Sequence, residues 1–406
     1  MKVLILSSKM PYPLKDGGAI AVYMLAKGLV NAGASVTTLA LNTRKHWVSP
    51  NSIPVDVKNS IGLIPIDIKT NISFFDALIN LLFSKKPYVA QRFYKQKVKN
   101  VLERVLRSNS FDIIQIDGLY VTPYLPHIRQ NTTAHISYRA HNVESLIWTR
   151  LAKNQTRGFK RWYYGILARR IQVMEQKLVN RYDAFLPITT NDAHWFSMNG
   201  NNKPFIVIPV GFDKPSNANN SISATHPSNI AFLGSLDWPP NQEGLLWFIE
   251  MVWPLVYNIQ PKIQLHVAGR NAPQWLENRI VGTEGVHYHG EVDDATRFIL
   301  NFPVIAVPLL SGSGMRVKIV EAMLLGRVVV STTVGAEGIA AEDGVSICIA
   351  DHPKIMAETI VELSVKPAKT MSISDKALLF AKENFDGNNI GKNLFDFYNS
   401  LLNDNT

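Results

Sequence analysis

The chain has 406 residues, a net charge of +10 and a hydrophobic content of 46%, and its mean hydropathy is close to zero. This composition excludes a disordered chain, and no apolar run approaches the roughly 20 residues that a membrane-spanning helix needs. The length indicates two domains, or three at most. The apolar run at the N-terminus is too short for a signal peptide, and the single cysteine, Cys348, excludes an intrachain disulfide. We therefore expect a cytoplasmic globular protein.

The charge is divided unevenly along the chain. Residues 1–213 hold 28 lysines and arginines against 12 aspartates and glutamates, a net charge of +16, whereas the remainder holds 14 against 20, a net charge of −6. This asymmetry predicts a basic surface on the N-terminal half for an anionic partner, and both nucleic acid and anionic lipid headgroups fit it. A basic surface that serves only solubility is the alternative. No nucleic-acid recognition motif accompanies the charge, so nucleic acid is the weaker candidate.

Strands and helices alternate through the chain, with turn-rich segments between them. In the first half the predicted elements are strands at 3–7, 35–41, 112–116, 134–138, 184–188 and 205–209, and helices at 19–32 and 161–181. The polar stretch 214–229 is rich in Ser, Asn and Pro and is the predicted linker. The second half has predicted strands at 230–234, 263–268, 286–289, 302–308 and 328–331, and helices at 242–256 and 317–325. Two successive α/β domains are therefore expected, with the loops after their strands facing a cleft.

The strongest motif is Pro308-Leu-Leu-Ser-Gly-Ser-Gly-Met-Arg-Val-Lys, in which a buried strand leads through a Gly/Ser loop into a helix. The free N–H groups at such a helix start bind anions, and the two glycines allow close backbone approach. Arg316 and Lys318 add two cationic side chains that suit a diphosphate. Glu321, further along the same helix, is placed to accept hydrogen bonds from sugar hydroxyls. The alternative is an ordinary helix start with solvated charges.

This segment resembles the donor-binding region of the retaining GT-B glycosyltransferases of family 4, which reads Glu-x7-Glu followed by Ala-Met, a glycine and a strand. The chain offers Glu321-Ala-Met-Leu-Leu-Gly and then a strand that ends at Ser331. Other segments look like the family's first glycine loop, its interdomain signature and three more donor loops, at 11–18, 207–213, 232–235, 267–270 and 287–290. The resemblance implies the GT-B fold, two Rossmann-like α/β domains that face each other across a cleft. The expected domains are 1–213 and 230–385, with a C-terminal helix at 386–406 that packs back on the first.

The resemblance also implies a donor, a nucleotide-diphosphate sugar with UDP favoured over GDP, and no cofactor. Two departures matter. Ser313 stands where the first glutamate of the motif should fall, and the Arg and Lys that many members place after the first strand of this domain are missing. The phosphate charge is then left to Arg316 and Lys318, with Arg270 as a third cation. The expected donor-binding residues are Gly17, Gly18, Gly234, Arg270, His289, Ser313, Gly314, Met315, Arg316, Lys318 and Glu321.

Two polar residues at strand ends of the N-terminal half are the candidate catalytic residues. Asp117 follows the strand at 112–116, and His141 follows the next strand along the chain. Family members carry an Asp or a His at such positions near the reacting hydroxyl, so we expect acceptor orientation or proton handling, and a structural histidine is the alternative. The neighbouring residues Arg139, Asn142 and Glu144 are the expected acceptor-binding residues.

A metal ion is not expected. His287 and His289 could form a metal pair, but no third ligand has suitable spacing, and the chain has no Asp-x-Asp element. A dinucleotide dehydrogenase is disfavoured, because no Gly-x-Gly-x-x-Gly follows the first strand. The leading interpretation is a retaining, metal-independent hexosyltransferase that uses a glycan or lipid-linked acceptor in bacterial cell-surface polysaccharide or glycoconjugate synthesis. A nucleotide-sugar epimerase of the same fold and a non-catalytic nucleotide-sugar-binding protein are the alternatives.

Two segments of the basic half suit a membrane interface. Residues 157–170 contain five cationic and four aromatic residues, and residues 74–86 are apolar with a basic end. An anionic membrane surface is therefore a candidate partner, which would place the protein peripherally on the inner face of the plasma membrane. The alternative is an ordinary amphipathic helix packed on the sheet.

Overall fold

A computed structural model describes residues 1–14, 16–44, 47–71, 73–155, 158–213, 228–312 and 314–403. The chain divides into two compact units, the first made of residues 1–213 and 385–406 and the second of residues 214–384. Most of the predicted linker, residues 214–227, lies outside the described residues, as do Ser313 and Arg157. Each unit contains one six-stranded sheet and several helices, so the predicted α/β architecture with two parallel sheets is confirmed.

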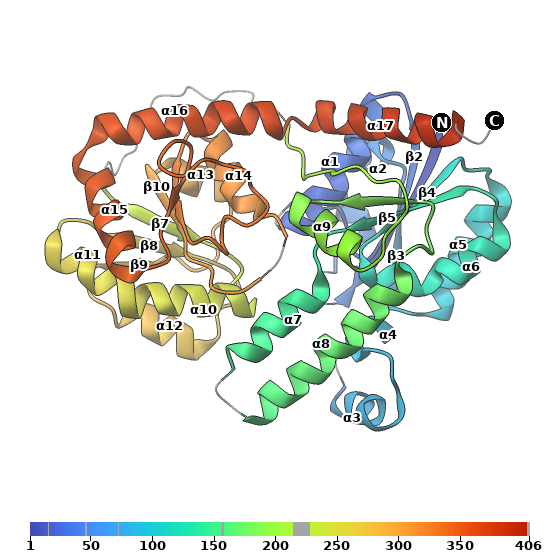
Figure 1. Ribbon diagram of the computed structural model, residues 1–406, viewed down its shortest axis with the longest axis horizontal. Helices are drawn as coiled ribbons and strands as arrows, with labels where there is room; N and C mark the ends of the chain where they lie inside the picture. Colours follow the sequence, from blue (N-terminus) through green and yellow to red (C-terminus); the bar gives the residue numbers. More distant parts are fainter. Residues whose placement is uncertain are drawn as a thin grey trace. The chain divides into compact units, whose positions relative to one another are not determined.

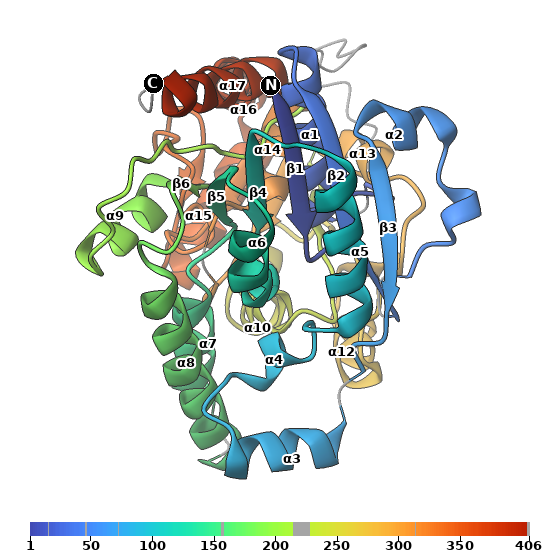
Figure 2. The same cartoon turned by 90° about the vertical axis from the view of Figure 1, so that its right-hand side faces the viewer.

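The first unit is built on a sheet with the order β3-β2-β1-β4-β5-β6, and all neighbouring strands are parallel (Figure 2). Its strands are β1 (Lys2–Ser7), β2 (Ser35–Thr43), β3 (Leu63–Ile68), β4 (Ile113–Asp117), β5 (His135–Ala140) and β6 (Ala184–Pro187). The predicted strand at 205–209 is wrong. Phe205 forms an isolated bridge to Phe185, and Ile206 and Ile208 donate to the backbone oxygens of Phe185 and Pro187 at 3.2 and 2.8 Å, so the segment runs beside β6 without forming a further strand of the sheet.

Helices cover both faces of this sheet (Figure 1). The helices of the unit are α1 (Gly17–Asn31), α2 (Val55–Ser60), α3 (Phe74–Phe83), α4 (Tyr88–Gln91), α5 (Gln96–Ser108), α6 (Leu125–Asn131), α7 (Glu144–Lys153), α8 (Gly158–Leu178), α9 (Thr190–Met198) and α17 (Gly387–Asn403), with 3₁₀ turns η2 (Pro50–Ser52) and η3 (Leu119–Tyr124). Helices α7 and α8 pack side by side, with Trp148 edge-on to Tyr164 at 5.5 Å between ring centroids. In the described part of the chain, no helix is long and apolar enough to cross a membrane.

The central strand β1 is buried on both faces, which explains its continuous apolar sequence. Its side chains alternate between two cores. Val3 and Ile5 pack in the core that holds residues of α1 and α17, whereas Leu4 and Leu6 pack in the core that holds residues of α5 and α6. The sheet is thus stabilised by burial on both sides, and polar residues are left to the strand ends.

Helix α17 joins the first unit from the far end of the sequence by a close crossing with α1. Glycines make this crossing possible, because a Cβ atom on Gly391 would fall on the backbone of Gly28. A Cβ on Gly28 would likewise lie 2.7 Å from the backbone oxygen of Gly387. The helix then buries Leu394 and Tyr398 in the core beside β1.

The second unit has the sheet order β12-β11-β10-β7-β8-β9, again with parallel neighbours. Its strands are β7 (Ile230–Leu233), β8 (Leu265–Ala268), β9 (Val286–Tyr288), β10 (Val304–Val307), β11 (Val328–Ser331) and β12 (Cys348–Ile349). Its helices are α10 (Pro239–Trp247), α11 (Trp253–Ile259), α12 (Gln274–Val281), α13 (Ala295–Leu300), α14 (Val317–Leu324), α15 (Pro353–Val365) and α16 (Pro367–Asn384).

The single helix predicted at 242–256 is wrong. The chain instead forms α10, a π-helical turn η4 (Phe248–Val252) and α11. Pro254 lies in the first turn of α11, where its missing N–H is tolerated, and it could not continue a regular α-helix from α10. Trp253, at the same junction, is buried in the core of the unit.

Each sheet has a switch point, where the strand order reverses direction. It lies between β1 and β4 in the first unit and between β7 and β10 in the second. In open α/β sheets, ligands bind beyond the carboxyl ends of the strands at such a point. A ligand site in either unit is therefore expected among the residues that follow these four strands.

Candidate active site

The two candidate catalytic residues meet beside the switch point of the first unit. Asp117 ends β4 opposite Ser7, which ends β1, and Ser7 Oγ donates a hydrogen bond to Asp117 Oδ2 at 3.3 Å. His141 directly follows β5, and its Nε2 lies 2.8 Å from the same carboxylate oxygen. The side chain of Asp117 is 1% exposed, whereas that of His141 is 22% exposed. A buried carboxylate thus holds an imidazole that is accessible from solvent.

A buried arginine supports this carboxylate from within the sheet. Arg139 Nη1 lies 3.7 Å from Asp117 Oδ1 and donates a hydrogen bond to the backbone oxygen of Ala21 at 3.0 Å. Burial raises the pKa of Asp117, but His141 and Arg139 outweigh burial and leave that pKa below its usual value. Burial also lowers the pKa of Arg139, and Asp117 opposes this shift. The structure therefore places Arg139, an expected acceptor-binding residue, beneath Asp117 and away from solvent.

A chain of buried hydrogen bonds connects Asp117 to helix α17. Gln115 Nε2 donates to Asp117 Oδ1 at 3.2 Å, and the hydroxyl of Tyr398 donates to Gln115 Oε1 at 3.0 Å. Ser137 on β5 is the second partner of this hydroxyl, at 2.7 Å between the oxygens. All four side chains are buried, so the network fixes the position of Asp117 through strands β4 and β5.

The segment after His141 is fixed by two carboxyl groups. Glu144 begins α7 and accepts a hydrogen bond from the Tyr120 hydroxyl at 2.9 Å. Glu175, on α8, accepts the backbone N–H groups of Glu144 and Ser145 at 2.7 and 3.3 Å. Burial raises the pKa of Glu144 and raises that of Glu175 to about 8. Asn142 hydrogen-bonds the Glu144 side chain, so these two expected acceptor-binding residues form one cluster next to His141.

The second unit carries a cationic cluster at its own switch point. Lys318, in the first turn of α14, donates from Nζ to the backbone oxygen of Leu233 at 3.3 Å and to Asn241 Oδ1 at 3.0 Å. Gly234 follows β7, and a Cβ there would lie 2.9 Å from Asn241 Nδ2 and 3.2 Å from Lys318 Nζ, so only glycine leaves the ammonium this position. Burial, helped by repulsion from Arg316, lowers the pKa of Lys318 to about 7. A bound anion would reverse this shift.

Arg316 organises the loop between β10 and α14. It is 6% exposed and is the N-cap residue of α14, and its Nη1 donates to the backbone oxygen of Gly314 at 2.8 Å. Its guanidinium lies 6.0 Å from the ring of Trp238. Gly312 and Gly314 have φ values of 130° and 78°, and a side chain at position 312 would collide with this guanidinium. Met315 is buried at 9% exposure, and the predicted Ser313 lies outside the described residues.

Arg270 joins the cluster, and His289 does not. Arg270 Nε donates to Ser235 Oγ at 2.9 Å, and the backbone oxygen of Ser235 accepts from Asn241 Nδ2, also at 2.9 Å. His289 Nε2 instead lies 2.9 Å from His266 Nδ1, and its ring packs edge-on against Phe298. The structure thus links Gly234, Arg270 and Lys318 through the residues after β7.

Glu321 lies three residues after Lys318 on α14. Burial raises the pKa of its carboxyl group to about 7, and no charge among the described residues opposes this shift. A partly buried carboxyl group with this pKa can bind hydroxyl donors of a ligand at neutral pH.

The start of α1 is capped within the chain. Asp16 is the N-cap residue and accepts the N–H groups of Gly18 and Ala19, both at 3.0 Å. Lys9 Nζ lies 2.5 Å from the same carboxylate, and a side chain at position 18 would meet the Lys9 side chain. Gly17 and Gly18, both expected to bind the donor, therefore form a helix start that Asp16 caps.

Several residues of these two clusters were not predicted from the sequence. They are Gln115, Glu175 and Tyr398 in the first unit, and Trp238, Asn241 and Glu243 in the second, where Glu243 Oε2 accepts from Ser311 Oγ at 2.5 Å. The residues after β7 could have been found from the sequence. A strand, a short loop and a helix start with two prolines follow one another there, the same order of elements as at 308–318. No local sequence pattern could have indicated Tyr398, because its hydrogen-bond partners are more than 260 residues away in the sequence.

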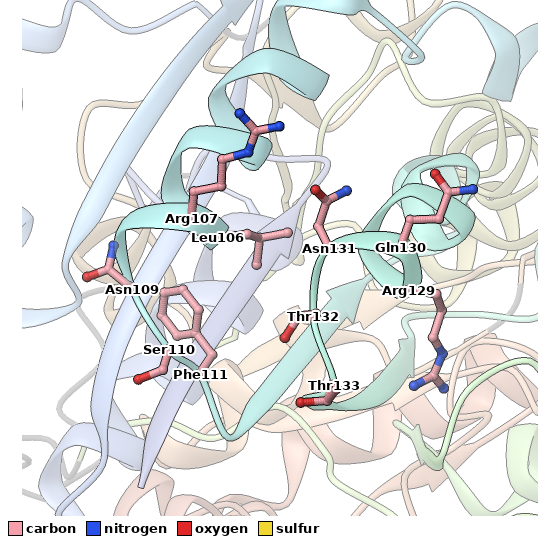
Figure 3. Close-up of a pocket in the computed structure, with 10 residues that line it drawn as sticks. All are labelled: Leu106, Arg107, Asn109, Ser110, Phe111, Arg129, Gln130, Asn131, Thr132 and Thr133. Atoms are coloured by element: carbon pink, nitrogen blue, oxygen red, sulfur yellow. The ribbon is translucent and has the colours of Figure 1, made fainter.

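A shallow hollow of about 600 Å³ lies elsewhere on the first unit (Figure 3). It is lined by the end of α5, the end of α6 and the segments that lead from them into β4 and β5. It therefore lies at the amino ends of these strands, whereas Asp117 and His141 lie at the carboxyl ends. The hollow does not belong to the candidate site.

Residues 227–365 match the family model described as Glycosyl transferases group 1. The part of the chain that carries the cationic cluster is thus similar to this family, in agreement with the resemblance seen in the sequence.

Whole-chain comparisons extend the likeness to both units. A Klebsiella pneumoniae protein described as "Uncharacterized 44.6 kDa protein in cps region" is 22% identical over 411 residues, which cover 97% of this chain and 99% of the relative. HepE of Anabaena, solved in complex with UDP-glucose, covers 98% of this chain and 100% of its own at a TM-score of 0.67 and 16% identity. Sucrose-phosphate synthase of Thermosynechococcus elongatus covers 100% of both at a TM-score of 0.71 and 14% identity. These structures confirm the predicted GT-B fold.

Proposed function

We propose that this protein transfers a sugar from a uridine-diphosphate sugar to an acceptor hydroxyl, with retention of configuration. One observation carries the proposal: Arg316, Lys318 and Arg270 gather at the switch point of the unit that matches the group 1 glycosyl transferases. The UDP-glucose complex of HepE supports UDP as the carrier of the sugar.

The cationic cluster suits the leaving group of this reaction. Negative charge develops on the departing diphosphate, and cations fixed in advance at that position lower the barrier. Arg316 and Lys318 are held by the loop and by Asn241, so they need little rearrangement when the ligand binds. Because these two side chains can neutralise the diphosphate, we propose a reaction that needs no metal ion. The Glu321 carboxylate accepts hydrogen bonds from hydroxyl groups of the ribose or the sugar.

The pair of His141 and Asp117 suits the acceptor. A carboxylate that fixes an imidazole sets its orientation, so His141 can orient the attacking hydroxyl or take its proton. Asn142 and Glu144 lie next to it and are the proposed contacts of a glycan or lipid-linked glycan. The relative from a "cps region" supports a role in bacterial cell-surface polysaccharide or glycoconjugate synthesis.

A donor panel tests the proposal. The protein is incubated with UDP- and GDP-sugars, with and without a chelator, and the products are followed by NMR. We expect UDP release from a UDP-sugar, unchanged by the chelator, and an acceptor product that keeps the anomeric configuration of the donor. An epimerised nucleotide sugar would identify an isomerase, and binding without turnover would identify a binding protein. Release of UDP only in the presence of a divalent metal would contradict the metal-independent reaction.

A further inference from the structure

Helix α3 presents its apolar side to solvent. Large apolar residues recur on it with the spacing i, i+3, i+4, i+7 and i+8, the pattern that normally faces a protein core. Here all five are exposed, and the exposed fractions are 75% for Phe75, 41% for Leu78, 57% for Ile79, 66% for Leu82 and 84% for Phe83. A continuous stripe of this kind marks an interaction surface, whereas single exposed apolar residues do not.

The inner side of α3 is held by polar contacts. Asn80 is only 6% exposed, and its Nδ2 donates to Gln91 Oε1 at 2.6 Å and to the backbone oxygen of Lys86 at 3.1 Å. Arg170, on α8, donates to Asn80 Oδ1 at 3.0 Å and to the backbone oxygen of Leu81 at 2.8 Å. The helix is thus fixed with its polar side inward and its apolar side outward, the reverse of an ordinary surface helix.

The start of α8 adds an exposed aromatic pair. Phe159 and Trp162 are 74% and 53% exposed, and their rings lie 5.8 Å apart. Both views of the molecule place this end of α8 and helix α3 at the same end of the first unit (Figures 1 and 2). The arrowheads of β1 and β3 point toward that end in Figure 2, so the carboxyl ends of the strands, with Asp117 and His141, face the same way.

The charge around these apolar residues is almost entirely positive. Segments 73–86 and 158–170 contain six lysines and arginines and one acidic residue, Asp76. Lys85, Lys86, Lys160 and Arg161 are exposed. Arg170 is half-buried and bound to α3, so it positions the helix and is not available to a partner, although it belongs to the segment 157–170 that the sequence predicts for a membrane interface.

We propose that α3 and the start of α8 form a docking surface for an anionic lipid bilayer, in which the apolar stripe enters the interface and the flanking cations meet the headgroups. An apolar face bordered by cations and aromatic rings fits an interface whose surface is negative and whose interior is apolar. A second copy of this chain that packed through the same surface would bring these cations against their own copies, which is unfavourable. The surface holds the acceptor end of the first unit against the bilayer, where a lipid-linked acceptor would lie.

Vesicle co-sedimentation tests the surface. The probes are phosphatidylcholine vesicles with and without phosphatidylglycerol, at low salt and at 1 M salt. We expect binding that needs phosphatidylglycerol and falls at high salt, where the Debye length shrinks from about 10 Å at 0.1 M to about 3 Å. The variant Leu82→Ser with Phe83→Ser should lose at least about tenfold in affinity, since burial of one such side chain corresponds to tenfold or more. The control Ile355→Ser with Leu379→Ser changes two exposed apolar residues of the second unit and should bind like the unaltered protein.

Charge variants form an independent arm. Lys85→Gln with Lys86→Gln should lower the affinity by roughly 25-fold, since each cation near an anionic surface contributes about fivefold. Lys376→Gln with Lys382→Gln is the matched control on exposed residues of α16 and should have no effect. Circular dichroism and UDP calorimetry verify that each variant is folded and that its donor site is intact, so a failure of the proposed donor site would be seen separately.

Three results would overturn the proposal. The first is equally weak sedimentation of the unaltered protein with neutral and acidic vesicles at low salt. The second is binding of the Leu82 and Phe83 variant that matches its control. The third is self-association in analytical ultracentrifugation without vesicles, abolished by the same variant, which would assign the stripe to a second copy of the chain.

Discussion

At the scale of single residues, burial gives the members of each candidate pair different roles. Asp117 is sealed in the sheet and His141 is not, so the carboxylate can hold the imidazole without contact with a ligand. In the second unit, Lys318 has a lowered pKa because it is buried beside a second cation, and this arrangement favours the arrival of an anion. Burial of Lys318 beside Arg316 costs stability in the protein without ligand, which is typical of functional sites.

Substitution at these two positions of the first unit should separate catalysis from stability. His141→Gln should lower the turnover number by about 10²–10⁴, the usual contribution of a positioned acid or base, without change in stability. Asp117→Asn should in addition lower the free energy of unfolding by about 3–5 kcal/mol, because Arg139 would keep a buried charge without its carboxylate partner. Initial rates and urea unfolding measure the two effects. A His141→Gln protein with normal turnover would show that the histidine is structural.

The lowered pKa of Lys318 predicts that UDP binding takes up a proton. With a pKa of about 7, most of the Lys318 side chains are neutral at pH 8 in the protein without ligand. A diphosphate beside the ammonium favours its charged form and raises this pKa, so binding at pH 8 should consume protons, and the uptake should vanish toward pH 6. Calorimetry in two buffers of different ionisation enthalpy measures the number of protons.

Lys318→Met should abolish this uptake and weaken UDP binding by roughly 1.5–3 kcal/mol, the loss expected for a hydrogen bond to a charged group. Lys376→Met, on an exposed lysine of α16, is the control and should change neither quantity. If Lys318→Met takes up as many protons as the unaltered protein, the diphosphate binds away from α14.

At the scale of elements, local signals predicted the helix that carries the donor cluster but not the helix that faces it. The helix predicted at 317–325 is α14 at Val317–Leu324, because a buried strand, a glycine loop and a helical repeat are all local. The helix predicted at 242–256 is interrupted at η4, and its start lies at Pro239. Asn241 therefore falls in the first turn of α10 and reaches Lys318, a contact over 77 residues that no local pattern encodes.

The crossing of α1 and α17 gives a prediction at this scale. Gly391→Ala places a methyl group on the backbone of Gly28, and backbone cannot move aside as a flexible side chain can. We expect the first unit to lose about 1–3 kcal/mol or more, the usual cost of overpacking. Gly165→Ala is the matched control, because position 165 is exposed in the middle of α8 with nothing within 4 Å of an added Cβ. That change should be neutral or add about 0.4–1 kcal/mol.

Urea unfolding, followed by the tryptophans of the first unit, measures both variants. If Gly391→Ala were as stable as Gly165→Ala, α17 would not be packed on α1 as closely as the glycines indicate.

At the scale of the whole molecule, the two successive α/β units were predicted from the sequence, whereas the strand order within each sheet was not. Alternating buried strands and amphipathic helices are local patterns, and their restart after the polar segment 214–229 marked the second unit. The return of residues 385–406 to the first unit depends on glycine contacts and on the Tyr398 hydroxyl, which form only in the folded chain. Arg316, Lys318 and Glu321 were predicted together because they lie within one motif, whereas the Asp117 network draws on β1, β4, β5 and α17.

Truncation after Asn384 should therefore disrupt the first unit and spare the second. The missing helix supplies Ile390, Leu394 and Tyr398 to the core beside β1, and their loss exposes the apolar side of α1 to solvent. In limited proteolysis we expect cleavage within residues 1–213 at protease concentrations that leave the full chain intact.

Calorimetry should give an unchanged affinity for UDP, because the proposed donor residues all lie in the second unit apart from the two glycines of α1. UDP should also protect that unit from protease, since a ligand stabilises the part of the chain to which it binds. If the truncated protein resisted protease as well as the full chain does, α17 would not be part of the core of the first unit. If it lost UDP binding, part of the donor site would lie outside the second unit.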